Sequence, residues 1–330
     1  MPRPDRTAVP PLPAPARPTE PLAAVHRGVT AVHRGVTAVG VVIGLALVGC
    51  GSGANPAATD TTVTAPAPAP SDAPAPSDAE TGTGRPGLTG AYEPRVVAEL
   101  PHDAGAFTQG LEWHDGALLE STGLRGESSL RRVEIATGQP VGRIDLDDRL
   151  FAEGLTVVDD EVLQLTWQDQ TLVVTPLTAL DPDPSGAPAY QADAYPGEGW
   201  GVCATRGANG DPELIVSDGS STLTRRDPVT MAERSRVEVT HDGAPVIDLN
   251  ELECVGDQVL ANVWKTDTIV AIDAATGVVE ATIDASALVP PDVTDGNDVL
   301  NGIAAAPDGT FYLTGKRWPV LYQVRFEPVP

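Results

Sequence analysis

Lysine and aromatic residues are scarce in this chain. Lys265 and Lys316 are the only lysines among 21 basic positions, and Phe, Trp and Tyr together make up 4% of the 330 residues. Basic residues are also outnumbered, because 46 Asp and Glu leave a formal net charge of −25. Such a balance argues against binding to nucleic acid and against electrostatic binding to anionic lipid.

The motifs of common hydrolytic and metal centres are also missing. His102, His114 and His241 have no HxH or HxxxH spacing, and the chain contains no CxxC pair and no GxSxG elbow. A histidine-based metal centre or a serine triad therefore has little support. The acidic turns at 159–160 and 292–298 are better explained as solvated turns than as Ca²⁺ sites, so no metal site is predicted.

A prominent apolar run, AVGVVIGLALVGC at 38–50, is too short to span a bilayer as an ordinary helix. It follows five arginines and many prolines in residues 1–36, an order typical of a secretory signal. The run ends in Leu-Val-Gly-Cys at 47–50, which resembles the bacterial lipobox, whose cysteine is lipidated. We expect residues 1–50 to be a lipoprotein signal peptide and Cys50 to anchor the protein outside the cytoplasm, at the bacterial cell surface. A simple secretory signal and a retained helix are the alternatives.

Residues 51–90 are rich in Pro, Ala, Thr, Ser and Asp and have little to bury, which predicts a disordered tether. The remaining residues, 91–330, are enough for one folded domain. Two cysteines remain there, Cys203 and Cys254. In an oxidising compartment they could form a disulfide, and two separate buried thiols are the alternative.

Five similar segments recur in the folded part: FTQGLEW, FAEGLTV, GEGWGVC, LNELECV and LNGIAAA. Each places a polar residue before Gly or Glu and then continues as an apolar strand; these polar residues are Gln109, Glu153, Glu198, Asn250 and Asn301, at intervals of 44, 45, 52 and 51. A turn signal follows each strand: Asp115-Gly116, Asp159-Asp160, Asn209-Gly210, Gly256-Asp257 and Asp308-Gly309. No long stretch shows helical periodicity, so the repeats predict antiparallel sheet.

Repeats of this length are typical of β-propeller blades, so we predict an all-β, five-bladed β-propeller. The last repeat, 301–329, has room for three strands, and the segment 93–100 is predicted to supply the missing outer strand. This N-terminal strand would close the last blade and hide the sheet edges.

Rotation of the repeats about one axis would bring their polar residues together at one mouth. Trp167, Trp264 and Lys316 follow three of these positions by fourteen or fifteen residues and would form a second layer. A lysine kept in a chain that otherwise uses arginine suggests a need for a compact ammonium. The alternative is that the polar residues cap strand ends and the tryptophans pack between blades.

FTQGL, ESTGL, FAEGLT, QLTW, GEGWG, LNELE, ANVWKTD, VLNGIA and LTGKRWPVLYQV occur in order between residues 91 and 326. Together they resemble the plant- and bacterial-type glutaminyl-peptide cyclotransferases, five-bladed propellers that convert N-terminal Gln to pyroglutamate and release ammonia. The resemblance implies that Glu153 is the catalytic acid and base. It places the pocket residues at Phe107, Gln109, Phe151, Trp167, Trp200, Asn250, Trp264 and Lys316.

The chemistry of the residues agrees with these roles. One carboxyl group can take a proton from the attacking α-amine and return it to the departing nitrogen, and a tryptophan-rich enclosure would raise the pKa of Glu153. Lys316 and Asn250 are candidates to stabilise the tetrahedral oxyanion, and Gln109 to orient the carboxamide. No cofactor is expected for catalysis; a structural Ca²⁺ is possible but not indicated.

Two other classes of function fit parts of the pattern. A non-catalytic propeller lipoprotein that binds peptides or glycans would also place tryptophans and amides at its mouth. A lactonase-like metal-dependent propeller would use Glu153, Glu198, Asn250 and Asn301 as ligands. We expect the partners to be peptides or proteins with N-terminal Gln, the membrane to be contacted through the lipid anchor only, and the protein to be a monomer.

Overall fold

Strands make up almost all regular structure in a computed structural model that describes residues 87–181, 190–207 and 209–330. The predicted signal peptide at 1–50, with Cys50, and nearly all of the predicted tether at 51–90 lie outside these residues. In the described part the helices are two short 3-10 turns, η1 (Leu177–Leu180) and η2 (Ser286–Leu288). None of its helices is long and apolar enough to cross a membrane. The all-β prediction is confirmed.

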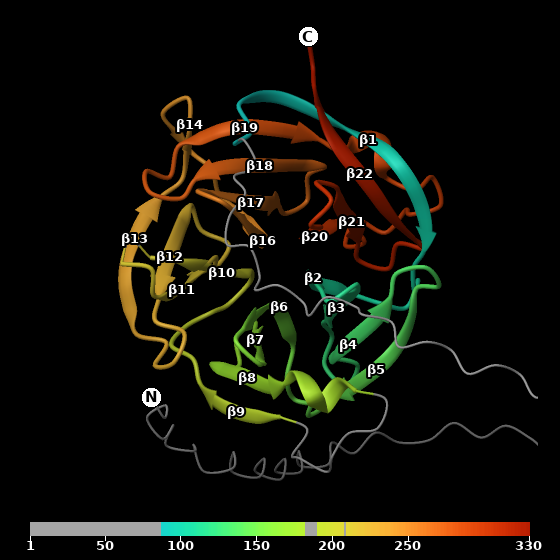
Figure 1. The fold of residues 1–330 in the computed structure, drawn as a ribbon, viewed down its shortest axis with the longest axis vertical. Coiled ribbons are helices and arrows are strands. Elements are labelled where there is room, and N and C mark those ends of the chain that lie inside the picture. Colours follow the sequence, from blue (N-terminus) through green and yellow to red (C-terminus); the bar gives the residue numbers. More distant parts are fainter. Residues whose placement is uncertain (1–86, 182–189, 208) are drawn as a thin grey trace, which may run out of the picture. The chain divides into compact units, whose positions relative to one another are not determined.

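Three four-stranded antiparallel meanders follow one another along the chain (Figure 1). The first consists of β2 (Thr108–His114), β3 (Ala117–Thr122), β4 (Ser129–Glu134) and β5 (Gln139–Asp145). The second consists of β6 (Ala152–Val158), β7 (Glu161–Thr166), β8 (Thr171–Pro176) and β9 (Gln191–Ala194). The third consists of β10 (Val202–Arg206), β11 (Pro212–Val216), β12 (Thr222–Arg226) and β13 (Glu233–Glu238).

The rest of the chain forms a small hairpin and an eight-stranded sheet. The hairpin pairs β14 (Thr240–His241) with β15 (Ala244–Pro245). In the large sheet, β16 (Leu249–Val255), β17 (Gln258–Val263), β18 (Thr268–Asp273) and β19 (Val279–Asp284) form a fourth meander. Beside it lie β20 (Leu300–Ala305), β21 (Phe311–Gly315), β22 (Val320–Pro328) and the N-terminal β1 (Gly90–Pro101).

Strand β1, the first strand of the described chain, pairs with β22, the last. It pairs antiparallel with β22 from Tyr92 to Pro101, as the sequence predicted for 93–100. Its first residues, 90–92, also pair parallel with 281–283 in β19, a contact that the sequence did not predict. This second pairing merges two groups of four strands into one sheet and covers an edge of each.

The innermost strands succeed one another around a common centre (Figure 1). Contacts run from β2 to β6, β10, β16 and β20 in turn, and β20 contacts β2 again. Apolar clusters fill the spaces between neighbouring sheets, for example Leu119 and Leu130 of the first meander against Leu155 and Val173 of the second. The middle strands β3 and β7 are buried almost throughout, whereas β5 and β13 are largely exposed.

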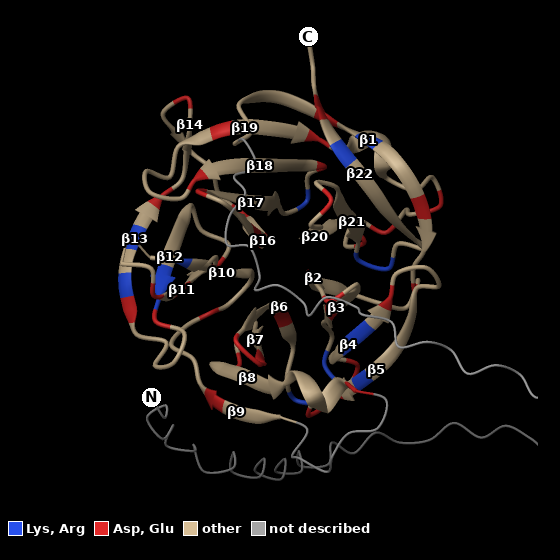
Figure 2. Ribbon diagram, viewed as in Figure 1, with Lys and Arg blue, Asp and Glu red and all other residues tan. Residues whose placement is uncertain are grey.

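Turn chemistry and surface charge follow the positions of the strands. The five predicted turns all lie between the first and second strand of a repeat, and Asp115 and Gly116 both have positive φ, as a tight hairpin turn requires. Charged residues gather on outer strands; β13 carries both signs, with Arg236 paired to Glu233 (Figure 2).

Two further links connect neighbouring sheets. A disulfide joins Cys203 in β10 to Cys254 in β16, with the Cα atoms 5.4 Å apart. The sequence left open a disulfide or two separate thiols, and the structure contains the disulfide. Glu251 occupies a position that is glycine in the other repeats, and its carboxylate accepts hydrogen bonds from the backbone N–H of Leu111 at 3.2 Å and Ile303 at 2.9 Å. Its side chain therefore ties β16 to β2 and β20.

Candidate active site

Close approach of the innermost strands brings the predicted site residues together. A Cβ on Gly154 would lie 2.7 Å from the carbonyl oxygen of Trp200, and a Cβ on Gly201 would lie 2.1 Å from that of Asn250. Only glycine permits these contacts. Gln109 in β2, Glu153 in β6 and Trp200 before β10 each precede such a glycine, and Asn250 in β16 precedes Glu251, which stands at the same place in its repeat.

This geometry corrects the alignment of the third repeat. The sequence aligned Glu198 with Gln109 and Glu153, but the structure places Trp200 at that position, two residues later. The segment GEGWG has three glycines, so its sequence does not reveal which one meets the neighbouring strand. Glu198 instead accepts hydrogen bonds from the indole N–H groups of Trp167 and Trp200 and does not line the cavity.

A cavity of about 340 Å³ lies at the centre of these strands. Nine residues predicted from the sequence line it: Phe107, Gln109, Phe151, Glu153, Trp167, Trp200, Asn250, Trp264 and Lys316. Three further lining residues were not predicted: Leu124, Asn297 and Arg317. Arg317 directly follows Lys316 and Leu124 ends the ESTGL motif, so both had a signal in the sequence. Leu124 also has a φ of 83°, a strained conformation for a bulky side chain.

Glu153 is the buried carboxylate of the cavity, with 5% of its surface exposed. Its Oε1 accepts a hydrogen bond from Nε2 of Gln109 at 3.2 Å. Burial raises the pKa of Glu153 well above its usual range; the ammonium of Lys316 opposes this rise and the charge of Glu198 adds to it. The raised pKa favours the protonated form of Glu153, so the group is suited to hold a proton during a reaction and to release it again.

Lys316 supplies a buried cation to the lining of the cavity. Burial lowers its pKa, and the charge of Glu153 opposes that change. The ammonium lies 5.1 Å from the centre of the Phe107 ring, and the guanidinium of Arg317 lies at the same distance. Backbone bonds fix this turn, because Lys316 N–H donates to Val299 at 2.9 Å and Arg317 N–H to Ala106 at 2.7 Å.

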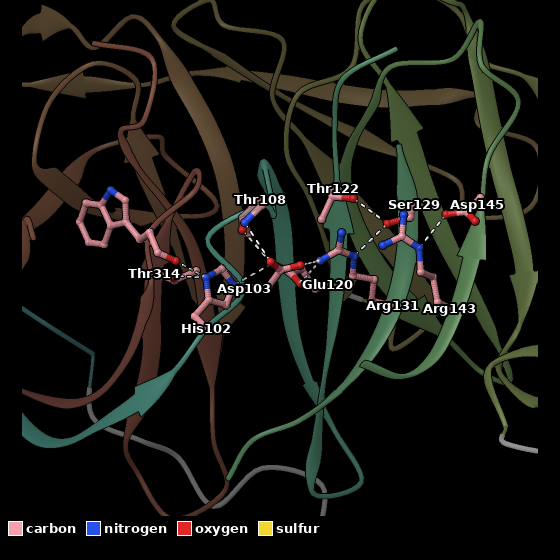
Figure 3. A network of polar contacts seen from close by, with 12 residues as sticks. His102, Asp103, Thr108, Glu120, Thr122, Ser129, Arg131, Arg143, Asp145 and Thr314 are labelled. Carbon is pink, nitrogen blue, oxygen red and sulfur yellow. Dashed lines mark hydrogen bonds and ion pairs between the residues drawn. The ribbon is translucent and has the colours of Figure 1, made fainter. Parts of the chain in front are cut away.

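A buried network of polar side chains (Figure 3) contacts the residue that follows this turn, Trp318. His102 Nδ1 lies 2.6 Å from the carbonyl oxygen of Trp318, and its Nε2 lies 2.9 Å from Oε1 of Glu120. Both partners are acceptors, so the ring donates from both nitrogens as an imidazolium. Burial would lower the pKa of His102, but Glu120 raises it overall. Arg131, bonded to Asp103 at 2.8 Å, extends the network.

Amide side chains complete the polar part of the site. Asn250 is 2% exposed and lines the cavity beside Trp200 and Trp264. Asn301, also predicted at the mouth, does not line it; its Nδ2 donates to the carbonyl of Thr108 at 2.9 Å and to Oε1 of Gln109 at 3.4 Å. Asn301 therefore fixes the orientation of Gln109, which in turn donates to Glu153.

Among the described residues, no group of three or more His, Cys, Asp or Glu side chains is placed to hold a metal ion. Glu153 and Asn250 reach the cavity, whereas Glu198 and Asn301 are engaged elsewhere.

The chain matches the family model of glutamine cyclotransferase over residues 72–326. It belongs to the glutamine cyclotransferase family. A glutaminyl-peptide cyclotransferase of Arabidopsis thaliana is 39% identical over 240 residues, which are 71% of this chain and 72% of the plant protein. The crystal structure of Myxococcus xanthus glutaminyl cyclase superposes with a TM-score of 0.65 at 37% identity; the match covers 74% of this chain and all of that one. For this glutamine cyclotransferase, the cavity around Glu153 is the candidate active site.

Proposed function

We propose that the protein converts the N-terminal Gln of peptides or proteins to pyroglutamate with release of ammonia, and that Glu153 is the general acid and base. The observation that carries the proposal is the position of Glu153: a buried carboxylate with a raised pKa in a cavity walled by three tryptophans. Family membership supports the activity.

The reaction needs one group that moves a single proton twice. A peptide α-amine has a pKa of about 7.7 to 8, so a neutral fraction is present at neutral pH. As the amine nitrogen attacks the γ-carboxamide carbon, the Glu153 carboxylate takes the proton that the nitrogen loses. The resulting carboxylic acid returns this proton to the carboxamide nitrogen as the carbon–nitrogen bond breaks, and ammonia departs. A carboxyl with a raised pKa can perform both transfers.

Negative charge develops on the former carboxamide oxygen during the attack. Lys316 is a buried cation that lines the cavity, and Asn250 adds a buried amide donor to the same lining. We assign oxyanion stabilisation to these two residues. Burial lowers the pKa of Lys316, and the charge of Glu153 opposes this decrease. The ammonium and the carboxylate therefore favour each other's charged form.

The aromatic walls select the conformer that reacts. Attack within one residue requires the glutamine side chain to fold back on its own α-amine, and a confined apolar space favours that compact shape over the extended one. Phe151, Trp167, Trp200 and Trp264 bound this space, and Gln109 is placed to orient the carboxamide beside Glu153.

Ammonia release from a Gln-initiated peptide tests the proposal. The purified chain should release one ammonia for each pyroglutamyl peptide formed, and the Asn-initiated peptide serves as the control. Binding without ammonia release would instead indicate a peptide-binding module. Activity that appears only with a divalent metal and disappears on chelation would indicate a metal-dependent propeller.

We further propose that the fold is a five-bladed β-propeller. The three meanders would be three blades, and the eight-stranded sheet would be two more, joined where β1 pairs with β19. In this arrangement β1 supplies the outer strand of the last blade, after β20, β21 and β22.

We infer an extracytoplasmic, membrane-anchored location from the lipobox-like sequence at 47–50. Lipid on Cys50 would be the only membrane contact of a monomeric enzyme. Cys50→Ser should remove the lipid and release the enzyme into the medium. Membrane association unchanged by this substitution, without lipid on the wild-type cysteine, would contradict the anchor.

A further inference from the structure

The walls of the cavity are two groups of aromatic rings in edge contact. Phe107 packs on Phe151 with ring centres 6.3 Å apart, and Phe151 packs on Trp167 at 5.6 Å. In the second group, Trp200 packs on Trp264 at 5.4 Å with the rings nearly perpendicular. Both groups end at a cation, because Lys316 lies over Phe107 and Lys265 lies 4.3 Å from the centre of Trp264.

Glu198 joins these two groups. Its Oε1 accepts a hydrogen bond from the indole Nε1–H of Trp167 and another from that of Trp200, the latter at 3.0 Å. An indole offers one donor, so this carboxylate oxygen fixes the orientation of both rings at once. The other oxygen, Oε2, lies 3.4 Å from Nε2 of the exposed Gln168.

The backbone around Glu198 is held on both sides. Gly199 N–H donates to the carbonyl of Trp167 at 3.1 Å, and Trp200 N–H donates to that of Ser217 at 3.0 Å. The Trp200 ring rests against Gly219, where a Cβ would approach ring carbons to 2.7 Å. Glu198 therefore stands at a fixed place between two walls that belong to different sheets.

We propose that Glu198 is a positioning residue for the cyclisation: it sets the separation of the Trp167 and Trp200 walls and biases proton transfer at Glu153 by its charge. This inference rests on the proposed function of the cavity. Glu198 does not line the cavity, so it acts through the two indoles and through its field. The groups that act electrostatically on Glu153 are Lys316, which favours the carboxylate, and Glu198, which disfavours it.

Two substitutions separate the two effects. Glu198→Gln keeps an oxygen that can accept both indole N–H groups but removes the charge. We expect its near-UV circular dichroism and KM to stay close to wild type, while the acidic limb of the kcat–pH profile moves to lower pH. Glu198→Ala removes both the acceptor and the charge. It should change the near-UV spectrum and lower kcat/KM by roughly 10- to 100-fold, because the walls lose their alignment.

Gln168→Ala is the matched control, since it removes a partner of Oε2 and should leave kcat/KM, the spectrum and the pH profile unchanged. The proposal would be overturned if both Glu198→Ala and Glu198→Gln kept the wild-type spectrum, the wild-type kcat/KM and the wild-type acidic limb. If the alanine variant does not fold, the pH limb of Glu198→Gln alone decides it. A wild-type chain that releases no ammonia would refute the proposed function, and the spectra would still test whether Glu198 orders the walls.

Discussion

Gln109 and Glu153 are joined by a hydrogen bond across two sheets, from Nε2 in β2 to Oε1 in β6 over 3.2 Å. Gln109→Glu would replace this donor with a second carboxylate and raise the pKa of Glu153 further. We expect kcat at neutral pH to fall roughly tenfold or more and its acidic limb to move to higher pH. Gln109→Ala, the control without the charge, should lower kcat with a smaller shift of the limb. An unshifted limb in Gln109→Glu would show that this limb does not report Glu153.

The two lysines provide a matched pair of substitutions. Lys316→Arg places a larger, planar guanidinium in a buried position beside Phe107, so we expect kcat to fall roughly tenfold or more. Lys265 is exposed and does not line the cavity, so Lys265→Arg keeps a cation near the ring of Trp264 and should leave kcat nearly unchanged. Ammonia release from one Gln-peptide measures both variants. Equal loss in the two would mean that Lys316 has no special role.

The position of strand β1 at the edge of β22 indicates what a deletion in this strand should do. Removing residues 93–100 would expose the edge of β22 that these residues pair with in the structure. We expect this variant to aggregate or to melt well below wild type, because unpaired edges invite association. A chain that begins at residue 87 keeps the strand and is the control. Thermal unfolding of the two chains checks the prediction, and equal melting temperatures would contradict it.

The side chain of Glu112 should make the stability of the folded protein depend on pH. Burial raises its pKa to about 7, although hydrogen bonds from Thr156 and Val157 oppose the rise. A carboxyl whose pKa is raised in the folded state holds a proton that the unfolded chain loses, so stability falls as pH increases from about 4.5 to 7. Glu112→Gln should remove this loss and stabilise the protein at pH 8 by roughly 1–3 kcal/mol, with little change at pH 4. Urea unfolding at both values tests the sign; destabilisation by Glu112→Gln at pH 8 would contradict it.

Much of the site could be predicted because its signals are local. The turns depend on Asp and Gly at fixed positions, such as Asp115-Gly116, and the spacing from Glu153 to Trp167 recurs from Asn250 to Trp264. In the structure each of these tryptophans donates its backbone N–H to the carbonyl two residues before the polar position, at 3.0 Å and 2.8 Å. Equal spacing therefore reflects equal hydrogen bonding.

The missed features depend on contacts between distant segments. The parallel pairing of β1 with β19 is made between residues about 190 positions apart, and nothing in either segment specifies the other. The third repeat was misaligned because several glycines stand near Trp200, and only the neighbouring strand decides which one it meets. Asn297 reaches the cavity from the loop before β20, whose sequence indicated only a solvated turn.

The turnover of Glu153→Gln tests the central claim most directly. Glutamine has nearly the shape and hydrogen-bonding reach of glutamate, but its amide cannot accept the proton of the attacking amine. The variant should fold as wild type and bind a Gln-initiated peptide with similar affinity. Its rate of ammonia release should fall by roughly 10²-fold or more. Ammonia release by Glu153→Gln at a rate near that of wild type would contradict the assignment of Glu153 as the acid and base.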